Sequence, residues 1–313
     1  MQAAEYPAAT LSESATHAGV VAIIPAHNEA RYIGSVVLMT RKHVETVIVV
    51  DDGSEDETAE VAEAAGALVL RHPQNAGKGV ALNTGFVKAR ELNPRVVITL
   101  DGDWQHLPAE IDRVISPILR GDADIVVGSR YLEVTSEVPK ARVFGHWGFT
   151  SLTNAISGVS LTDSQSGYRA FSPAALKVLV FSSTSFSVES EMQFLARNHK
   201  LRVVEVPITI RYLDKPKRSL LAHGWTVLNG LLRLVAQHRP LLFFGLPGFV
   251  LLVIGLILGL QVVDAYNRFE ALAVGTALIV VILLLGGVFF LFTGIILHAL
   301  RILMDEIKAN LER

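Results

Sequence analysis

Residues 96–106 have the sequence VVITLDGDWQH, in which an apolar run ends in two aspartates separated by one glycine. A β-branched, apolar run of this kind predicts a buried strand of a parallel sheet. The strand would deliver Asp101 and Asp103 to its carboxyl end, where open α/β sheets bind their ligands. Because hard cations such as Mg²⁺ take carboxylate and phosphate oxygens, the pair is suited to hold a metal ion on a diphosphate. The alternative is an ordinary polar loop, in which Asp-x-Asp is common.

The composition excludes several classes of protein. The chain has 313 residues and a formal net charge of −2, so it lacks the basic surplus of a nucleic-acid-binding protein. It has no cysteine, which excludes disulfides and cysteine-ligated metal sites. The mean hydropathy of +0.41 is high for a typical soluble domain, and the apolar excess follows Pro240. The length suits one large domain or two ordinary ones.

Two long apolar segments after Pro240 predict membrane-spanning helices. Residues 241–260 contain no charged residue, and residues 271–300 contain only His298 as an ionisable group. About 20 apolar residues cross the core of a bilayer, so we expect two spans at about 241–263 and 272–298. The alternative is a pair of buried core helices, which the length of the uninterrupted runs disfavours.

The charges that flank the two spans predict their orientation. The connecting loop contains a single basic residue, Arg268, whereas basic residues gather before the first span and after the second. By the positive-inside rule, we expect an integral membrane protein whose N-terminal domain and C-terminus are cytoplasmic. The flanking basic residues are Arg211, Lys215, Lys217, Arg218, Arg233, Arg239, Arg301, Lys308 and Arg313.

Residues 218–239 have an amphipathic helical pattern. Leu221, Trp225 and Leu228 recur at helical spacing, and Arg233 lies on the opposite face. We expect this helix to lie in the membrane interface, although a helix docked on the folded domain has the same pattern. The predicted organisation is a flexible lead-in at 1–18, a folded domain at 19–217, this helix at 218–239, two spans within 240–300 and a cytoplasmic tail at 301–313.

The chain before residue 130 alternates predicted strands with predicted helices. This alternation is typical of βαβ units and predicts a doubly wound α/β fold with a mostly parallel sheet. The sequence has neither a G-x-G-x-x-G after the first strand nor a P-loop, which disfavours a dinucleotide-binding oxidoreductase and a P-loop NTPase. The expected strands are 20–24, 46–50, 67–70, 95–100 and 124–127, and the expected helices are 29–42, 57–65, 78–92 and 108–119.

Five polar segments follow the predicted strands or lie between predicted elements. In chain order they are IPAHNE (24–29), VDDGSEDET (50–58), NAGKG (75–79), DGDWQH (101–106) and DSQSGYR (163–169). Together they resemble the family 2 glycosyltransferases, which have the Rossmann-like glycosyltransferase-A fold. With its C-terminal helices the chain is similar to the polyprenyl-phosphate hexose synthases, such as dolichol-phosphate mannose synthase. The resemblance extends from about residue 20 to about residue 300.

The resemblance implies a nucleotide-binding site at the first two loops, the glycine-rich loop and the aspartate pair. A carboxylate such as Asp52 can accept hydrogen bonds from a base or a ribose, and the helix N-terminus at Lys78 favours anions. The alternatives are turn or cap hydrogen bonds for Asp52 and Ser54, and a solvated side chain for Lys78. The implied residues are Pro25, Ala26, Asn28, Glu29, Asp52, Ser54, Lys78, Asp101, Gly102 and Asp103.

The resemblance also implies a divalent metal, Mg²⁺ or Mn²⁺, held by Asp101, Asp103 and Gln105. The spacing would let the amide oxygen of Gln105 join the two carboxylates. Trp104 departs from the family, in which smaller residues are usual here. It would lie beside the donor sugar or pack under the loop, and the sequence does not decide between these positions. We expect His106 in a surface loop.

The acceptor side is expected to carry arginine, because a guanidinium binds phosphate in a fork and keeps its charge. The resemblance assigns Arg130 and Arg142 to the phosphate of the acceptor. Arg211 and Lys217 are candidates for closing over the donor diphosphate. For each of these residues the alternative is a solvated charge, in the latter two cases one that faces anionic lipid.

Two further pairs of charged residues lie near the predicted site. Asp163 and Arg169 flank a glycine turn, which would allow a local ion pair between them. Glu189 and Glu191 begin a helix, where acidic residues complement the helix dipole, and the sequence leaves open whether they also belong to the site.

These observations predict an inverting, metal-dependent hexosyltransferase of the mannose or glucose type. A GDP- or UDP-hexose would be the donor and a polyprenyl or dolichyl phosphate in the bilayer the acceptor, with Asp101, Asp103, Arg130 and Arg142 as catalytic residues. A phosphate acceptor is already ionised at neutral pH, so it needs no general base, whereas a hydroxyl acceptor would need one. The alternatives are transfer to a polysaccharide or another lipid, a nucleotidyltransferase, and a non-catalytic membrane scaffold that binds nucleotide.

Overall fold

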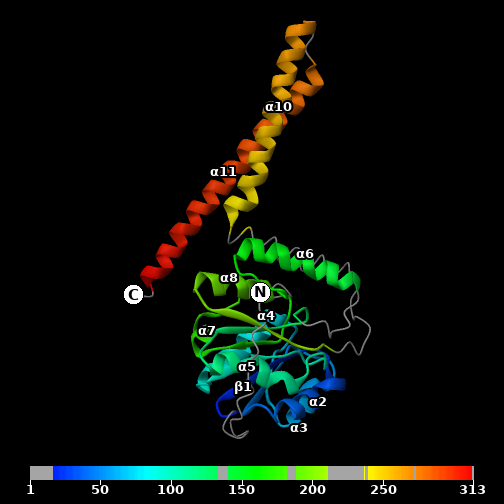
Figure 1. The fold of residues 1–313 in the computed structure, drawn as a ribbon, viewed down its shortest axis with the longest axis vertical. Helices are drawn as coiled ribbons and strands as arrows, with labels where there is room; N and C mark the ends of the chain where they lie inside the picture. The colour runs from blue at the N-terminus through cyan, green and yellow to red at the C-terminus, as the bar shows by residue number, and fades with distance from the viewer. Residues whose placement is uncertain are drawn as a thin grey trace. The chain divides into compact units, whose positions relative to one another are not determined.

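The computed structural model describes residues 17–132, 140–181, 188–210, 236, 239–270 and 273–311. The chain divides into two compact units, Met1–Gly230 and Leu231–Arg313. The first unit holds an α/β domain and the second holds two long helices (Figure 1). Residues 1–16 of the predicted lead-in and most of the predicted amphipathic helix at 218–239 lie outside the described residues.

The described part of the first unit contains a seven-stranded sheet in the order β3-β2-β1-β4-β6-β5-β7. Four strands from β3 to β4 are mutually parallel, and β5 is parallel to β7. β6 is antiparallel to both of its neighbours, so the sheet is mostly parallel, as predicted. The strands are β1 (Val20–Ala26), β2 (Thr46–Asp51), β3 (Leu68–Arg71), β4 (Val96–Thr99), β5 (Ile125–Ser129), β6 (Arg169–Phe171) and β7 (Val203–Pro207).

β6 and β7 are not among the strands that the sequence pattern predicts. β6 has three residues and begins with Arg169, which is 1% exposed, so it lacks the apolar alternation by which strands are identified. Its insertion between β4 and β5 brings the preceding loop to the end of β4, where the hydroxyl of Thr99 donates to the carbonyl of Gly167 at 2.9 Å. This short strand therefore positions a polar loop beside the aspartate pair.

Pro25 lies inside β1, which ends at Ala26, two residues beyond the predicted strand end at Ile24. β1 pairs with β2 as far as Ala26, but its pairing with β4 stops at Ile23. The backbone groups of a parallel strand point alternately to its two neighbours, so Pro25 faces the side on which β4 has already ended. Its missing N–H therefore costs no hydrogen bond of the sheet, and the strand continues.

Helices cover both faces of the sheet because each strand alternates two apolar sets (Figure 1). In β1, Ala22 and Ile24 belong to one buried cluster, and Val21 and Ile23 belong to the other. The first face is covered by α2 (Ala30–Thr40), α3 (Thr58–Ala64) and α5 (Ile111–Leu119), and the second by α4 (Lys78–Glu91), α7 (Pro173–Val178) and α8 (Val188–Asn198).

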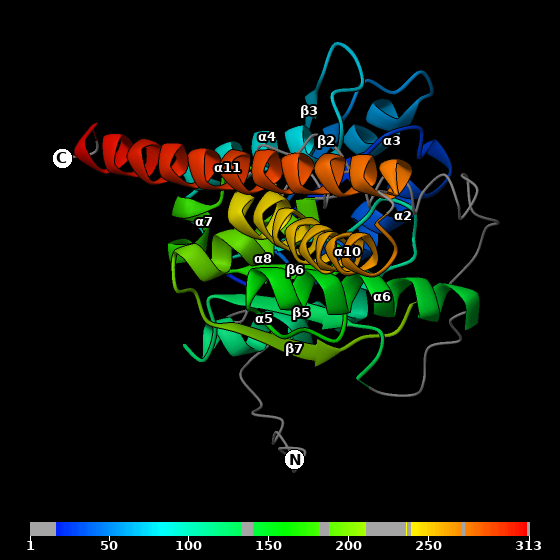
Figure 2. The ribbon, with the colours of Figure 1, turned by 90° about the horizontal axis from the view of Figure 1, so that it is seen from above.

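Two further elements complete the described part of this unit. A short 3-10 helix, η1 (Pro108–Glu110), leads directly into α5. The longer helix α6 (Lys140–Ser157) contacts α8 and lies beside it (Figure 2). Among the residues that the structure describes, both core clusters are formed between positions 20 and 210.

The second unit is a closely packed pair of helices, α10 (Leu246–Phe269) and α11 (Val274–Leu311), which follow a π-helical turn, η2 (Leu241–Gly245). A β-carbon added to Gly248 would lie 2.8 Å from the carbonyl oxygen of Gly287, so the two backbones approach closely. Small residues at such contacts are typical of helix pairs in membranes.

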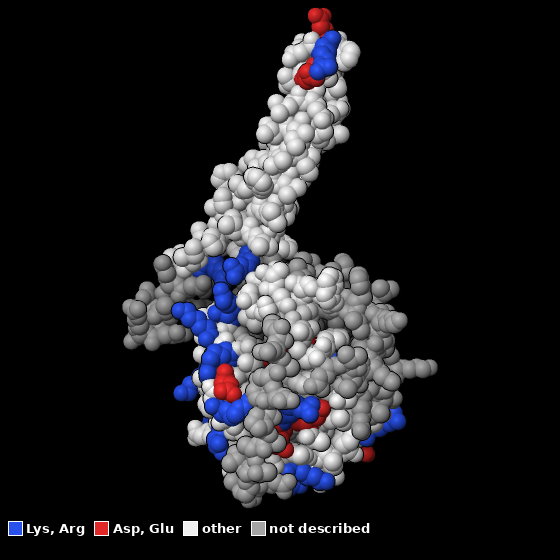
Figure 3. All heavy atoms as spheres, in the orientation of Figure 1, with Lys and Arg blue, Asp and Glu red and all other residues white. Residues whose placement is uncertain are grey.

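Both helices of this unit are long and apolar enough to cross a bilayer, over Leu241–Phe269 and Val274–Met304. Charged side chains gather at the turn between the helices, where Arg268 pairs with Asp264 at 2.9 Å (Figure 3). Along the helices the surface in this view is almost free of charge (Figure 3). The pair therefore has the composition of a transmembrane hairpin.

Candidate active site

The aspartate pair lies in the turn just beyond the carboxyl end of β4. The backbone N–H of Asp101 donates to Nδ1 of His106 at 3.1 Å, which closes the turn. Gly102 is buried, and a β-carbon there would lie 3.3 Å from Cδ1 of Ile33, so the turn packs directly onto α2. Asp101 and Asp103 are both only partly exposed, so two carboxylates lie near each other with reduced access to water.

Trp104 packs under this turn, which is one of the two positions that the sequence allows. Its φ of 63° is unusual for a bulky residue and reverses the direction of the chain. The half-buried ring packs against the core cluster on the α2 face of the sheet.

His106 is buried, and the expected surface position is wrong. It is 3% exposed, and its ring stacks on Tyr168 with 4.9 Å between the ring centroids. Burial lowers the pKa of His106 to about 4, so the ring is neutral at physiological pH. Because Nδ1 accepts the hydrogen bond from Asp101, the proton is on Nε2. His106 therefore acts as a fixed acceptor that shapes the turn.

Lys78 bridges two acidic residues and is not a solvated side chain. Its ammonium lies 2.9 Å from Oδ1 of Asp101 and 2.8 Å from Oε1 of Glu189. Burial works against the charged form, but the two carboxylates outweigh it and raise the pKa of Lys78 above its usual value. Lys78 is the first residue of α4. Its contact with Asp101 therefore brings the N-terminus of this helix close to the aspartate turn.

The two aspartates differ in their proton affinity. Burial alone would raise the pKa of Asp101, but Lys78 outweighs it and lowers the pKa to about 2. The pKa of Asp103 is raised to about 6 by burial and by the neighbouring charge of Asp101. The amide nitrogen of Gln105 donates to Oδ2 of Asp103 at 2.6 Å, and its backbone N–H donates to Oδ1 at 3.1 Å. Asp101, Asp103 and Gln105 therefore lie together.

Glu189 belongs to this cluster, which the sequence left open. It is 4% exposed, and its Oε2 has no hydrogen-bond partner among the described residues. Glu191 is also buried, at 3% exposure. A β-carbon on Gly167 would lie 2.9 Å from the ammonium of Lys78 and 3.1 Å from Oδ2 of Asp101. The loop before β6 therefore passes directly over the ion pair.

The first loop and the acidic loop are joined by reciprocal hydrogen bonds. The backbone N–H of Asn28 donates to Oγ of Ser54 at 2.9 Å, and the backbone N–H of Glu55 donates to Oδ1 of Asn28 at 2.9 Å. Asn28 has a φ of 56°, a conformation that asparagine tolerates better than most residues. The backbone N–H of Glu29 also donates to Thr58, at 2.8 Å. Ser54 thus makes a turn contact, which was the alternative to direct nucleotide binding.

Asp52 holds the glycine-rich loop through both of its carboxylate oxygens. It accepts hydrogen bonds from the backbone N–H groups of Ala76 at 3.0 Å and Gly77 at 2.7 Å. Nδ1 of His72 lies 2.7 Å from Oδ1 of Asp52, and Nε2 of His72 lies 2.9 Å from Thr84. His72 was not predicted as a site residue, although its position directly after β3 is the kind of strand end where site residues gather.

A hollow of about 490 Å³ lies beside these loops. Pro25 and Ala26 are the last two residues of β1 and directly precede His27, which lines the hollow. It has the size of a small-molecule site and a polar lining. It is lined by His27, Asp51, Gly53, Ser54, Glu55, Arg71, His72, Pro73, Gln74 and Asn75.

Arg130 forms a buried ion pair with Asp163. Nε lies 2.5 Å from Oδ2 of Asp163 and Nη2 lies 2.6 Å from Oδ1, with exposed fractions of 10% and 0% for the two side chains. The expected pair of Asp163 with Arg169 is therefore wrong. Arg169 donates instead to the backbone carbonyls of Ser164 at 2.7 Å and Ser166 at 2.8 Å. Because β6 reverses the chain, it turns Arg169 into the core and leaves Asp163 to Arg130.

Three of the predicted site residues are not placed by the structure. Arg211 and Lys217 lie outside the described residues, and Arg142 lies in α6 with a side chain that is not described. Their assignment stays a prediction from the resemblance.

The chain belongs to glycosyltransferase family 2. The model of this family, Glycosyl transferase family 2, matches residues 21–180, from the second residue of β1 to beyond α7. The match includes the aspartate turn, the loops after β1 and β2, and Arg130. The chain is therefore a glycosyltransferase, as the resemblance in the sequence implied.

Relatives in this family transfer sugars to polyprenyl phosphates, as their names state. The chain is 35% identical over 230 residues to the UDP-N-acetylglucosamine–dolichyl-phosphate N-acetylglucosaminyltransferase of Methanococcus voltae, covering 66% of this chain and 90% of the relative. It is 30% identical over 224 residues to the undecaprenyl-phosphate mannosyltransferase of Micrococcus luteus, covering 67% of this chain and 91% of the relative.

Solved structures support the fold. The glucosyl-3-phosphoglycerate synthase of Mycobacterium tuberculosis, in complex with Mn²⁺, UDP and glucosyl-3-phosphoglycerate, aligns with a TM-score of 0.58 and 22% identity over 73% of this chain and 86% of that chain. A structure of the same enzyme with Mg²⁺ and UDP aligns with a TM-score of 0.56 and 23% identity, covering 73% and 85% of the two chains. The predicted glycosyltransferase-A fold is confirmed.

The burial of the Arg130–Asp163 pair makes a prediction for stability. Arg130→Ala should lower the free energy of unfolding by about 3–5 kcal/mol, because it leaves the buried carboxylate of Asp163 without a counter-charge. The double variant with Asp163→Asn should lose clearly less than the sum of the two single variants. Urea denaturation of the purified full chain in detergent, followed by tryptophan fluorescence, measures all three changes.

Arg202→Ala is the matched control, because Arg202 makes a similar fork with Asp124 but is 57% exposed. This exposed pair should contribute no more than about 1 kcal/mol. Equal losses for Arg130→Ala and Arg202→Ala would show that burial does not govern the Arg130 pair.

Proposed function

We propose that the protein transfers a hexose from a nucleotide diphosphate sugar to a polyprenyl phosphate, with inversion at the anomeric carbon and with a divalent metal. The observation that carries the proposal is the cluster of Asp101, Asp103 and Lys78 at the end of β4, in a chain that also has two bilayer-length helices. The names of the polyprenyl-phosphate relatives support the acceptor.

The chemistry of the cluster fits a hard divalent cation. Asp101 and Asp103 offer carboxylate oxygens in one place, and Gln105, whose amide nitrogen now donates to Asp103, would turn its amide oxygen toward the ion. The pKa of Asp103 is raised by burial and then by the charge of Asp101, and a cation would oppose both effects. Mg²⁺ or Mn²⁺, when bound, would neutralise charge that develops on the leaving diphosphate. Lys78 is close enough to Asp101 to add a fixed positive charge on the same side.

The donor nucleotide is proposed to lie between the aspartate turn and the hollow beside the acidic loop. The rim residues Asp51, Glu55 and Asn75 offer side-chain groups of the kind that hydrogen-bond a base or a ribose. His72 and Ser54 would act mainly by holding the loops in place. Asp52 would act through the loop that it holds, because both of its oxygens already accept hydrogen bonds. A GDP- or UDP-linked hexose of the mannose or glucose type is the proposed donor.

The acceptor phosphate is proposed to attack in a single displacement, since it is already ionised at neutral pH and needs no general base. Arg142 is proposed to bind it directly. Arg130 is held in a fixed position by Asp163 and is proposed to contribute its positive charge beside the acceptor phosphate. Arg211 and Lys217 are proposed to approach the donor diphosphate.

The two helices are proposed to anchor the domain in the membrane. By the positive-inside rule, the charge asymmetry around them supports a cytoplasmic position for the catalytic domain and the C-terminus. An acceptor lipid in the same bilayer would then reach the site at a high local concentration.

A donor and acceptor panel tests this function directly. Membranes that contain the protein should convert one of a set of labelled GDP- and UDP-hexoses into a glycolipid when polyprenyl phosphate is added. Asp103→Ala should abolish this product, because it removes a metal-binding carboxylate. Asp122→Ala should not, because Asp122 is an exposed aspartate that precedes the amino end of β5. Turnover by Asp103→Ala near the wild-type rate at saturating Mg²⁺ would refute the metal assignment.

The raised pKa of Asp103 predicts a pH dependence of metal binding. Below a pKa of about 6 the carboxylate is protonated, so Mn²⁺ must displace a proton, and above it the site is ionised and binds without competition. Mn²⁺ affinity, measured by electron paramagnetic resonance, should be about tenfold lower at pH 5 than at pH 7.5. Asp103→Asn should bind weakly at both values and lose this dependence. An affinity for the wild type that stays constant across this range would contradict the assignment.

The acceptor role of Arg142 predicts a selective kinetic defect. Arg142→Ala should raise the KM for lipid phosphate by about ten- to a hundredfold, since a charge-assisted contact contributes about 1.5–3 kcal/mol. Arg142→Lys should recover only part, because an ammonium cannot reproduce the fork. Calorimetry with the nucleotide diphosphate and Mg²⁺ should give the same affinity for all three proteins. Tenfold weaker nucleotide binding would place Arg142 at the donor instead.

A further inference from the structure

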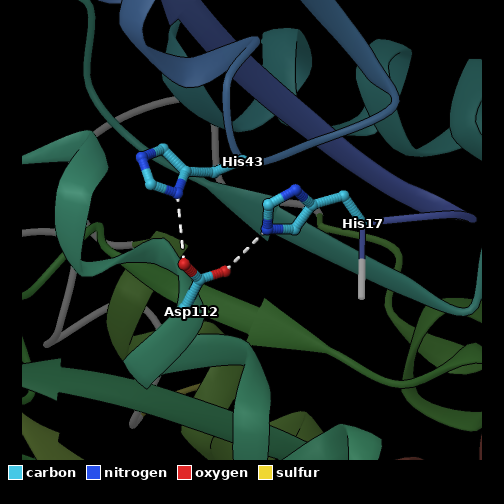
Figure 4. Close-up of side chains that lie close together, drawn as sticks. All are labelled: His17, His43 and Asp112. Atoms are coloured by element: carbon cyan, nitrogen blue, oxygen red, sulfur yellow. Dashed lines mark hydrogen bonds and ion pairs between the residues drawn. The ribbon is translucent and has the colours of Figure 1, made fainter. Parts of the chain in front are cut away.

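His17, His43 and Asp112 converge from three segments that are far apart in the sequence (Figure 4). His17 precedes β1, His43 lies between α2 and β2, and Asp112 is in the first turn of α5. Nε2 of His17 lies 3.0 Å from Oδ1 of Asp112, and Nδ1 of His43 lies 3.2 Å from Oδ2. One nitrogen or oxygen atom of each residue lies within 4.8 Å of the other two.

These atoms match the ligands of a zinc ion. Imidazole nitrogen and carboxylate oxygen bind Zn²⁺ at about 2.0–2.2 Å, so two ligands of a tetrahedral ion lie about 3.3 Å apart. Each imidazole nitrogen lies about this far from a different oxygen of Asp112, at 3.0 and 3.2 Å, so an ion held by both rings would take one or both oxygens of the carboxylate. Mg²⁺ prefers an octahedron of oxygen atoms, so two imidazoles make this cluster unlike the aspartate pair of the active site.

The segment that carries His17 is held in place without a metal. The backbone N–H of Gly19 donates to Oε2 of Glu45 at 2.5 Å, and that of Glu45 donates to the carbonyl of Val20 at 3.0 Å. The side chains of His17 and His43 are each 21% exposed, and their rings meet edge to face at 5.8 Å. Because the ligands are already ordered, a bound ion would incur little further loss of conformational entropy.

We propose that His17, His43 and Asp112 form a zinc site with three protein ligands and with water as the fourth ligand. Each imidazole nitrogen that now faces the carboxylate would present its lone pair to the ion, and the ring proton would move to the other ring nitrogen or be released. The ion would join the chain ahead of β1 to α5 and to the α2–β2 connection.

This site is separate from the reaction centre. It lies by the amino end of β1, whereas Asp101 follows the carboxyl end of the neighbouring parallel strand. β1 has seven residues, so its two ends are about 20 Å apart. The zinc ion would therefore stabilise the domain and take no part in sugar transfer.

Zinc binding by the purified full chain tests the proposal. The protein is first treated with a chelator to remove bound metal, and binding is then measured in excess Mg²⁺ so that Mg²⁺ occupies the aspartate pair. The wild type should bind one Zn²⁺ per chain in a competition assay with a chromophoric chelator. His43→Gln and Asp112→Asn should each weaken that binding at least tenfold. His199→Gln, which changes an exposed histidine outside the cluster, should not change it.

Thermal melting gives a second measurement that also reports whether each variant folds. At a zinc concentration about a hundredfold above the dissociation constant, Tm should rise by about 5–10 °C in the wild type and in His199→Gln, and by much less in His43→Gln. Without zinc, all four proteins should melt cooperatively. Zinc affinity of His43→Gln equal to that of the wild type, or a wild type that binds no zinc, would overturn the proposal.

Discussion

The ion pairs of Lys78 with Asp101 and Glu189 are the interaction on which the site depends. Carboxylates that lie close together and partly out of water repel each other and lose hydration, so a nearby cation stabilises their ionised forms. Lys78 begins α4, Asp101 follows β4 and Glu189 lies in the first turn of α8. One ammonium group therefore fixes three elements relative to one another.

The loop that leads to Lys78 is itself held by Asp52, which follows β2. The two strands β2 and β4 flank β1 in the sheet, so carboxylates at the ends of neighbouring parallel strands control one loop from two sides. Alternate residues of β1 belong to the two apolar clusters, so helices cover both faces of the sheet. Polar side chains of the strands can therefore reach solvent or a ligand mainly at the strand ends. The position of the site is thus a consequence of the sheet.

Much of this architecture could be predicted from the sequence, because it is encoded in local patterns. The five strands up to β5 and the aspartate turn follow from apolar runs that end in polar residues. The rest depends on contacts between distant residues. Arg130 and Asp163 are 33 residues apart and meet only because β6, too short to have a pattern of its own, reverses the chain. For the same reason the burial of His106 and of Lys78 could not be inferred from their surroundings in the sequence.

The glycine at position 167 is not required by the backbone conformation of its turn. Its φ is not among the positive values found for glycines of this chain, so another residue could adopt its backbone conformation. A β-carbon there would meet the ammonium of Lys78 at 2.9 Å and the carboxylate oxygens of Asp101 at 3.1 and 3.2 Å, so these charged groups would have to shift. Even the methyl group of alanine would move the ammonium of Lys78 away from the carboxylate of Asp101. The smallest substitution at this position would therefore weaken an ion pair. Repacking of neighbouring apolar residues could not compensate for it, because the space is bounded by charges and not by the hydrophobic core.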